Sequence, residues 1–281
     1  MPYATTSDGV RLYYEDIKPM VNNDLQMPSL FLVHGFALSS NMWDPQVEAL
    51  SKSFRVIRYD MRGHGKSASP ASANSYSKLC QVNDMKTVLD TCQVSTAVFI
   101  GHSMGACDVM LFYFTNASFK SMVAGLIIFS GGPGFAKESS RAKWNQAQNK
   151  TADIYETKGL QVLKGNPKNS GHTNITGLVN SARQALTHRK EDPMFALLLQ
   201  DGTAHIVKNL ETIKVPTLVL VGEEDAKQIH RSGDMMHAKI KGSQLYKIPF
   251  AGHEANIDNP EAFNQVVIHF CEKLQHNRSK F

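Results

Sequence analysis

The chain has 281 residues, a length that favours one large domain, with room for an inserted segment, over two separate domains. Hydrophobic residues make up 42% and charged residues 20%, as in ordinary globular proteins, so the composition excludes the disordered, fibrous and membrane-embedded classes. Lys and Arg outnumber Asp and Glu by 30 to 25, but basic and acidic residues alternate except at the C-terminus, which argues against a nucleic-acid or membrane-surface partner.

The cysteines and the N-terminal residues predict an intracellular location. The cysteines are irregularly spaced and form no Cys-x-x-Cys pair, which favours free thiols in a reducing compartment over disulfides or a zinc site: Cys80, Cys92, Cys107 and Cys271. The first residues lack the basic and apolar regions of a secretory signal, and no stretch approaches the roughly 18 apolar residues of a membrane span. We therefore expect a cytoplasmic protein.

The first half of the chain alternates predicted strands with predicted helices. Residues 10–16 have the β-branched and aromatic content of a strand. Three short apolar runs follow without alternation, as in strands buried on both faces of a parallel sheet: 30–33, 54–59 and 97–100. Helices are predicted between them over 46–52, after Asp44 as cap and Pro45 as first helical residue, and over 81–92. This βαβ rhythm predicts an α/β fold with a doubly wound, mostly parallel sheet.

The rhythm breaks in the middle of the chain and then resumes. A helix over 104–114 and a strand over 123–129 complete the first part. The following segment is polar, shows no convincing strand and predicts helices only: 139–150, 154–163, 174–187 and 193–199. Sheet elements then return: strands 216–221 and 244–248, and helices 229–240 and 260–274. We predict a core of residues 1–130 and 208–281, with residues 131–207 inserted as a helical cap.

A Gly-His-Ser-Met-Gly motif at 101–105 lies between the strand 97–100 and the helix 104–114. A serine on so sharp a turn has strained backbone angles, and the glycines on either side let the strand and the helix approach. Its hydroxyl projects above the sheet, while the Met104 N–H group at the helix N-terminus can stabilise an oxyanion. The motif therefore predicts Ser103 as a nucleophile.

A second motif, Gly65-Lys66-Ser67, looks like the end of a phosphate-binding loop of nucleoside triphosphatases. Such a loop needs a glycine five residues before Gly65, and position 60 is Asp. The sequence therefore excludes the nucleoside triphosphatase interpretation.

A serine hydroxyl needs a general base, and the base needs an orienting carboxylate. His253 follows the strand 244–248 and Asp225 follows the strand 216–221, so both come at carboxyl ends of strands, where open α/β sheets place their sites. Glu223 and Glu224 are alternatives to Asp225. The Gly-x-x-Asp spacing favours Asp225, because it leaves a short loop that brings the carboxylate back toward the strand end.

The tripeptide His-Gly-Phe at 34–36 directly follows the strand 30–33, so its loop should cross the top of the sheet beside the serine turn. The Phe36 N–H group is the predicted second oxyanion donor, and the Phe36 ring is a predicted pocket wall. Further candidates for lining the pocket are Leu38, His102, Phe135, Trp144, Tyr155 and Phe195, although aromatic residues on helices more often pack than recognise a substrate. Arg141 and Lys143 either attract a substrate carboxylate or form a solvated helix face, and the helical setting favours the second.

Together these motifs resemble the α/β-hydrolase fold over nearly the whole chain apart from the cap. Residues 60–67 look like the D-x-R-G-x-G-x-S loop of that family, where it is mainly structural. The resemblance is closest to small capped esterases, enol-lactonases and carbon–carbon bond hydrolases, and to cofactor-free haloperoxidases and perhydrolases. Three departures narrow the field. Ser103 stands where dehalogenases and epoxide hydrolases have Asp, residues 36–38 lack the Pro usual in perhydrolases, and a His-Gly-Gly-Gly loop is absent.

The resemblance implies acyl transfer by a Ser-His-Asp triad on a small or medium carboxylic ester or lactone, with no metal and no organic cofactor. Two alternatives stay open: a carbon–carbon bond hydrolase that uses the same residues on a vinylogous diketone, and a ligand receptor that turns over slowly. The tripeptide Ser279-Lys280-Phe281 resembles the peroxisomal address Ser-Lys-Leu, but Phe in place of Leu weakens the match and favours a frayed basic tail after the final helix.

Overall fold

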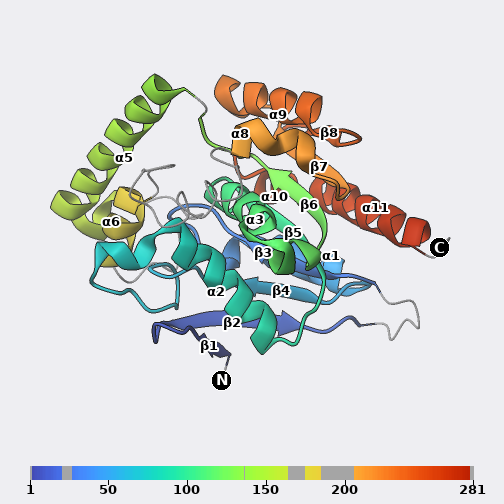
Figure 1. Ribbon diagram of the computed structural model, residues 1–281, viewed down its shortest axis with the longest axis horizontal. Coiled ribbons are helices and arrows are strands. Elements are labelled where there is room, and N and C mark those ends of the chain that lie inside the picture. The colour runs from blue at the N-terminus through green and yellow to red at the C-terminus, as the bar shows by residue number, and fades with distance from the viewer. Residues whose placement is uncertain (1, 21–26, 136, 164–174, 185–205, 279–281) are drawn as a thin grey trace.

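The computed structural model describes residues 2–20, 27–135, 137–163, 175–184 and 206–278 (Figure 1). Its centre is an eight-stranded sheet in the order β1-β2-β4-β3-β5-β6-β7-β8. The strands are β1 (Tyr3–Thr5), β2 (Arg11–Ile17), β3 (Ser29–Val33), β4 (Val56–Tyr59), β5 (Ala97–His102), β6 (Val123–Phe129), β7 (Thr217–Gly222) and β8 (Gln244–Ile248). Strands β3 to β8 run parallel, and β2 and β1 continue the sheet in antiparallel pairing beside β4. The predicted doubly wound, mostly parallel sheet is confirmed; β1 was not expected.

Helices cover both faces of this sheet, and α5 and α6 lie together at one end of the molecule (Figure 1). The described α-helices are α1 (Asp44–Ser51), α2 (Lys78–Thr91), α3 (Met104–Thr115), α4 (Ala117–Ser121), α5 (Glu138–Lys158), α6 (Ile175–Gln184), α8 (Ile206–Asn209), α9 (Lys227–Lys239), α10 (Ala255–Asp258) and α11 (Pro260–Arg278). Short 3-10 helices accompany them: η1 (Ser40–Trp43), η2 (Ala73–Tyr76), η3 (Gly159–Leu163) and η5 (Leu210–Thr212). Asp44, expected as a cap, is the first residue of α1, because η1 runs directly into that helix.

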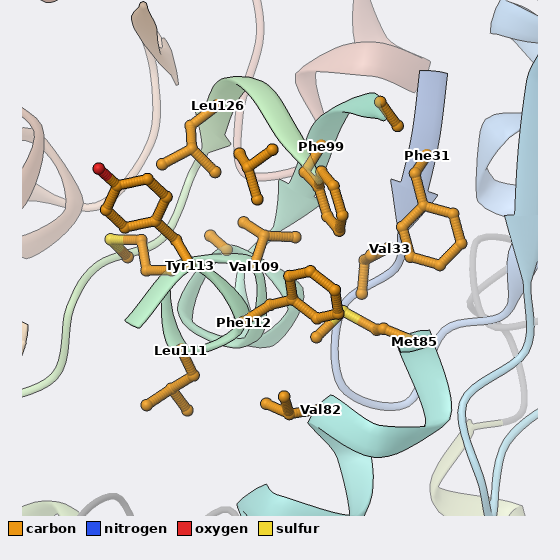
Figure 2. Close-up of a cluster of buried hydrophobic side chains, with 14 of the residues drawn as sticks. Phe31, Val33, Val82, Met85, Phe99, Val109, Leu111, Phe112, Tyr113 and Leu126 are labelled. Atoms are coloured by element: carbon orange, nitrogen blue, oxygen red, sulfur yellow. The ribbon is translucent and has the colours of Figure 1, made fainter. Parts of the chain in front are cut away.

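Side chains that alternate along the central strands build a hydrophobic core on each face of the sheet. In β3, Phe31 enters the cluster that α2, α3 and α9 cover, whereas Leu32 enters the cluster that α1 and α11 cover. Figure 2 shows the first cluster, in which the ring of Phe99 lies between strand and helix, 5.4 Å from the Phe31 ring and 4.8 Å from that of Phe112. Burying one such side chain contributes about 2–3 kcal/mol to the free energy of unfolding. Because the clusters are closely packed, they fix the positions of the strand ends.

Between β6 and β7, the structure has one continuous helix where two helices were predicted. Two helices, 139–150 and 154–163, were expected, but α5 runs unbroken from Glu138 to Lys158 because residues 151–153 contain no Gly or Pro. It ends at Gly159, whose φ of 62° leaves the helical region. The predicted helix 193–199 lies outside the described residues, and the division into a core and a cap of residues 131–207 remains a prediction.

Helices α5 and α6 contact the rest of the chain through a small hydrophobic cluster. Tyr155 of α5 and Leu178 of α6 pack in this cluster against Ala37, which lies in the loop after β3. The side chains of Ala152 and Leu178 are fully buried there. The helices are thereby connected to the loop that was expected to supply an oxyanion donor.

Residues 60–67 serve the fold through their polar side chains. The carboxylate of Asp60 accepts hydrogen bonds from the backbone N–H groups of Ser40 at 2.6 Å and Lys66 at 2.8 Å. The guanidinium of Arg62 donates twice to Asp84, each time at 2.6 Å, and this pair is almost completely buried. The loop therefore joins η1 and α2 to the strand ends.

Candidate active site

Ser103 lies alone on the turn between β5 and α3. Its φ of 53° and ψ of −109° fall outside the regions that L-residues prefer, a strain of about 1–3 kcal/mol that the surrounding structure must hold. The neighbouring glycines make the turn possible: a Cβ atom on Gly101 would lie 2.3 Å from the carbonyl oxygen of Gly105, and one on Gly105 would lie 2.6 Å from that of His34. The Ser103 N–H group donates to the carbonyl of Phe129 at 2.9 Å, which ties the turn to β6.

Asp225 and His253 meet Ser103 at the same edge of the sheet. They follow β7 and β8, the two strands beyond β6, so parallel pairing brings their loops to the carboxyl end of β5. His253 Nε2 lies 3.1 Å from Ser103 Oγ, and His253 Nδ1 lies 3.0 and 3.1 Å from the two carboxylate oxygens of Asp225. The structure therefore aligns a hydroxyl, an imidazole and a carboxylate in hydrogen-bonding sequence.

The carboxylate of Asp225 is set up to remain ionised. Its side chain is only 3% exposed, and this burial by itself raises the pKa. The hydrogen bond and the charge of His253, together with the Ala226 N–H group at 2.7 Å, outweigh burial and lower the pKa of Asp225 below its usual value. Glu223 and Glu224, the alternatives to Asp225, are exposed.

The loops after β7 and β8 are held against each other by backbone contacts. The Glu224 N–H group donates to the carbonyl of Ala251 at 2.8 Å, and the Gly252 N–H group donates to Asp258 at 2.9 Å. Gly222 leaves no room for a side chain here, because a Cβ atom on it would lie 1.9 Å from the carbonyl oxygen of Gly252. This close approach fixes the separation between Asp225 and His253.

The loop after β3 lies beside Ser103 in a defined orientation. A Cβ atom on Gly35 would lie 3.2 Å from the Cβ of Ser103, so the two backbones are close neighbours. His34 is fully buried; its Nε2 accepts from the Met61 N–H group at 3.0 Å, so Nδ1 carries the proton and donates to the Gly35 carbonyl at 2.7 Å. Within the described part of the chain, the N–H groups of Phe36 and Met104 donate to no protein acceptor.

A cavity of about 820 Å³ opens over Ser103. The predicted lining residues that reach it are Phe36, Leu38, His102, Phe135 and Trp144, with Lys143. Tyr155 does not line it, contrary to the prediction: its side chain is 8% exposed and faces α6, with its ring 5.9 Å from that of Phe36. Phe195 lies outside the described residues.

Arg141 also differs from the favoured prediction of a solvated helix face. The residue is only 9% exposed, donates to the Phe135 carbonyl at 3.2 Å and forms an ion pair with Glu138. It thus supports the loop in front of α5 rather than facing the solvent.

Several further lining residues were missed from the sequence: Lys78, Cys107, Ser130, Ser140, Gln148, Gln228, Ile229, Ser232 and Glu254. Cys107 could have been found, since it comes one helical turn after Ser103 on α3. Lys78 carried no sequence signal, because its burial depends on an ion pair with Asp108 at 2.7 Å and on Gln81 at 2.9 Å.

Neither a metal cluster nor a membrane span is evident in the described ranges. No group of three or more His, Cys, Asp or Glu side chains among these residues could hold a metal ion. Among the same residues, no helix combines the length and the apolar character that crossing a bilayer requires. All four cysteines belong to the described residues and are free thiols, as expected.

Comparisons with known proteins agree with this architecture. The model of a family described as serine aminopeptidase, S33, matches residues 27–259. A non-heme chloroperoxidase of Burkholderia pyrrocinia is 31% identical over 97% of this chain and 100% of its own, and a bifunctional esterase/perhydrolase of Acinetobacter calcoaceticus is 27% identical over 96% and 99%. The crystal structure of a hydrolase from Pseudomonas aeruginosa has a TM-score of 0.72 at 25% identity, covering 95% of this chain and 97% of that one. The chain therefore belongs to the serine aminopeptidase family and is a hydrolase of the α/β-hydrolase fold.

Proposed function

We propose that this hydrolase cleaves a small or medium carboxylic ester or lactone through an acyl-enzyme on Ser103. The observation that carries the proposal is the line of contacts from Ser103 through His253 to Asp225, at 3.1 and 3.0 Å. These distances lie within the range over which a proton passes between a nucleophile and its base.

In the first half of the reaction, His253 Nε2 takes the proton of the Ser103 hydroxyl while Oγ attacks the substrate carbonyl. The carbonyl π electrons move onto oxygen, and the N–H groups of Phe36 and Met104 bind the resulting oxyanion. Asp225 stabilises the imidazolium that forms. Collapse of the tetrahedral intermediate breaks the bond to the leaving alkoxide, which takes the proton from His253.

In the second half, water replaces the alcohol and the same groups act again. His253 removes a proton from water, and the hydroxide attacks the acyl carbonyl on Ser103. The bond to Oγ breaks, Oγ recovers the proton, and the carboxylic acid leaves. In a lactone the alcohol stays attached to the acyl group, so the product is a hydroxy acid.

The cavity supports a substrate of modest size with both apolar and polar parts. Phe36, Leu38, Phe135 and Trp144 provide an apolar wall close to Ser103. An esterase is also among the relatives that align over nearly the whole chain. We place one side of this wall on the predicted cap, residues 131–207, because Phe135 and Trp144 belong to that segment and their rings lie 5.7 Å apart.

Hydrolysis of p-nitrophenyl esters and of γ- and δ-lactones by the wild type and by Ser103→Ala tests the proposal. The wild type should turn over a member of this panel, and Ser103→Ala should lose that activity. A vinylogous diketone and an aminoacyl anilide serve as comparison substrates. Preference for either of these over every ester and lactone would contradict the proposed substrate class, and turnover too slow for catalysis with all of them would favour a receptor.

We also propose that the enzyme works in the cytoplasm, in keeping with its free thiols. Ser279-Lys280-Phe281, the tripeptide that resembles a peroxisomal address, lies outside the described residues. Imaging an N-terminal fluorescent fusion with and without these three residues decides between the two compartments: diffuse signal from both discards the address, and punctate signal that requires the tripeptide supports it.

A further inference from the structure

His102 occupies the point where the three loops of the site meet. It is the last residue of β5, directly before Ser103, and its side chain is almost completely buried. Its ring centroid lies 4.9 Å from that of His253 and 4.7 Å from that of Phe129. A Cβ atom on Gly35 would lie 2.6 Å from His102 Nδ1, so the ring also fills the space against the loop after β3.

The second nitrogen of this ring is bonded to the backbone of the proposed general base. His102 Nε2 lies 3.0 Å from the carbonyl oxygen of His253, and a carbonyl can only accept, so Nε2 carries the proton and donates it. The Ala251–Gly252 peptide, one residue before His253, is held as well, because the Gly252 N–H group donates to Asp258. Hydrogen bonds therefore hold the chain at His253 itself and at the residue before it.

This tether matters because the His253 side chain is partly exposed to solvent. It is 36% exposed, whereas the side chain of its partner Asp225 is 3% exposed. A partly exposed imidazole can rotate away from Ser103 unless the backbone of its residue is fixed. Catalysis by proton transfer is sensitive to such movement, since a displacement of about 1 Å can cost 10²-fold in rate.

The His102 ring stays neutral next to His253. Burial lowers the pKa of His102 to about 3, and the charge of His253 acts in the same direction. The hydrogen bond to the His253 backbone and the charge of Asp225 act to raise the pKa of His102, whereas the charge of His34 acts to lower it. A neutral ring does not repel the imidazolium that forms on His253, and the lowered pKa of His102 keeps it from taking the Ser103 proton.

We propose that His102 is a positioning residue that holds the His253 backbone through its Nε2–H···O=C hydrogen bond and thereby aims the imidazole at Ser103. The inference rests on the proposed function, and it adds a role for the second residue of the Gly-His-Ser-Met-Gly motif. His102 is not a proton carrier in the reaction.

A matched pair of variants separates the hydrogen bond from the space that the ring fills. Gln places an amide nitrogen as many bonds from Cα as His Nε2, whereas Met has the same length and no donor. His102→Gln should keep kcat within about threefold of the wild type, and His102→Met should lower it by about 10- to 100-fold, with a smaller change in KM. His102→Asn, whose amide corresponds to Nδ1 and falls short of the His253 carbonyl, should behave like the Met variant and replaces it if that variant does not fold.

A spectroscopic readout tests the same inference without turnover. The proton between His253 Nδ1 and Asp225 should give a downfield NMR resonance in the wild type and in His102→Gln, and the resonance should broaden or vanish in His102→Met. Equal kcat and an unchanged resonance in the Met variant, or equal losses in the Gln and Met variants, would overturn the role of the hydrogen bond. Failure of the proposed function can be told apart from failure of this inference. If the proposed function is wrong, turnover survives Ser103→Ala, whereas the NMR comparison of the His102 variants needs no turnover and still reports on the hydrogen bond.

Discussion

Gly222 and Gly252 approach so closely that the end of β7 and the loop after β8 share a backbone contact. A side chain on Gly222 would begin 1.9 Å from the Gly252 carbonyl oxygen, whereas a Cβ atom on Gly252 would meet only Asp258 Oδ2, at 3.4 Å. The backbones of the loops that carry Asp225 and His253 are therefore in direct contact. Only Gly222 must lack a side chain for this contact to form.

Gly222→Ala should push the loop after β8 away and separate the imidazole from the carboxylate. We expect kcat/KM to fall by about 10²-fold, because misplacement of about 1 Å is enough for such a loss. Gly252→Ala is the matched control and should retain most of the activity, since its Cβ atom makes an ordinary contact. Steady-state kinetics on one ester substrate measure both, and equal activities of the two variants would contradict the role of Gly222.

Asp225→Asn should reduce kcat by roughly 10⁴-fold while the protein remains folded, as expected when an orienting carboxylate becomes an amide. The amide cannot stabilise the imidazolium and favours the wrong tautomer of His253. Glu224→Gln removes a neighbouring but exposed carboxylate and should leave kcat unchanged. A larger loss in the Glu224 variant would reassign the acidic member of the site.

The buried neutral state of His102 predicts a pH dependence of stability. Its folded-state pKa is about 3 against an ordinary value of 6.5, so below pH 6.5 the unfolded chain takes up a proton that the folded chain does not. Stability is therefore fully present above pH 6.5 and decreases by about 1 kcal/mol per pH unit as the pH falls toward 3.

His102→Gln cannot take up this proton and should lack that contribution. Urea unfolding between pH 7 and pH 4.5 measures the free energy of unfolding of both proteins. As the pH falls, the wild type should lose more of this free energy than the variant does. Parallel curves for the two proteins would show that His102 is protonated in the folded state as readily as in the unfolded chain.

Trp144 and Tyr155 stand three turns apart on α5 and should differ in their effect on specificity. Trp144 lines the cavity, so Trp144→Ala should enlarge it and shift kcat/KM toward longer acyl chains by roughly 10-fold, the scale of a methylene or two in an apolar pocket. Tyr155 faces α6, so Tyr155→Phe should leave the chain-length profile unchanged. A series of p-nitrophenyl esters from acetate to octanoate gives the profile, and a shift caused only by the Tyr155 variant would contradict the assigned lining.

The sheet could be predicted because its signals are local. Runs such as 97–100 and 123–129 are apolar without alternation, as strands buried on both faces must be, and the turn at Ser103 is encoded by glycines two residues away on each side. The convergence of Asp225 and His253 on Ser103 followed from a general rule of parallel sheets rather than from their own neighbours.

The features that were missed depend on contacts between distant parts of the chain. Tyr155 faces α6, and nothing in the sequence of α5 itself indicates that α6 packs there. The burial of Lys78 depends on Asp108, 30 residues later. The tether from His102 to His253 spans 151 residues. Helix periodicity alone shows that such residues share a face but not which neighbour that face meets.

In the proposed mechanism, the acyl group of the substrate is carried by the side-chain oxygen of Ser103. The most direct test is rapid acid quenching of the enzyme with a p-nitrophenyl ester during turnover, followed by intact mass measurement and peptide mapping. We expect one acyl group per chain on the peptide that contains Ser103, and none on the Ser103→Ala variant. An acyl group on another residue, or undiminished turnover by Ser103→Ala without any adduct, would contradict it.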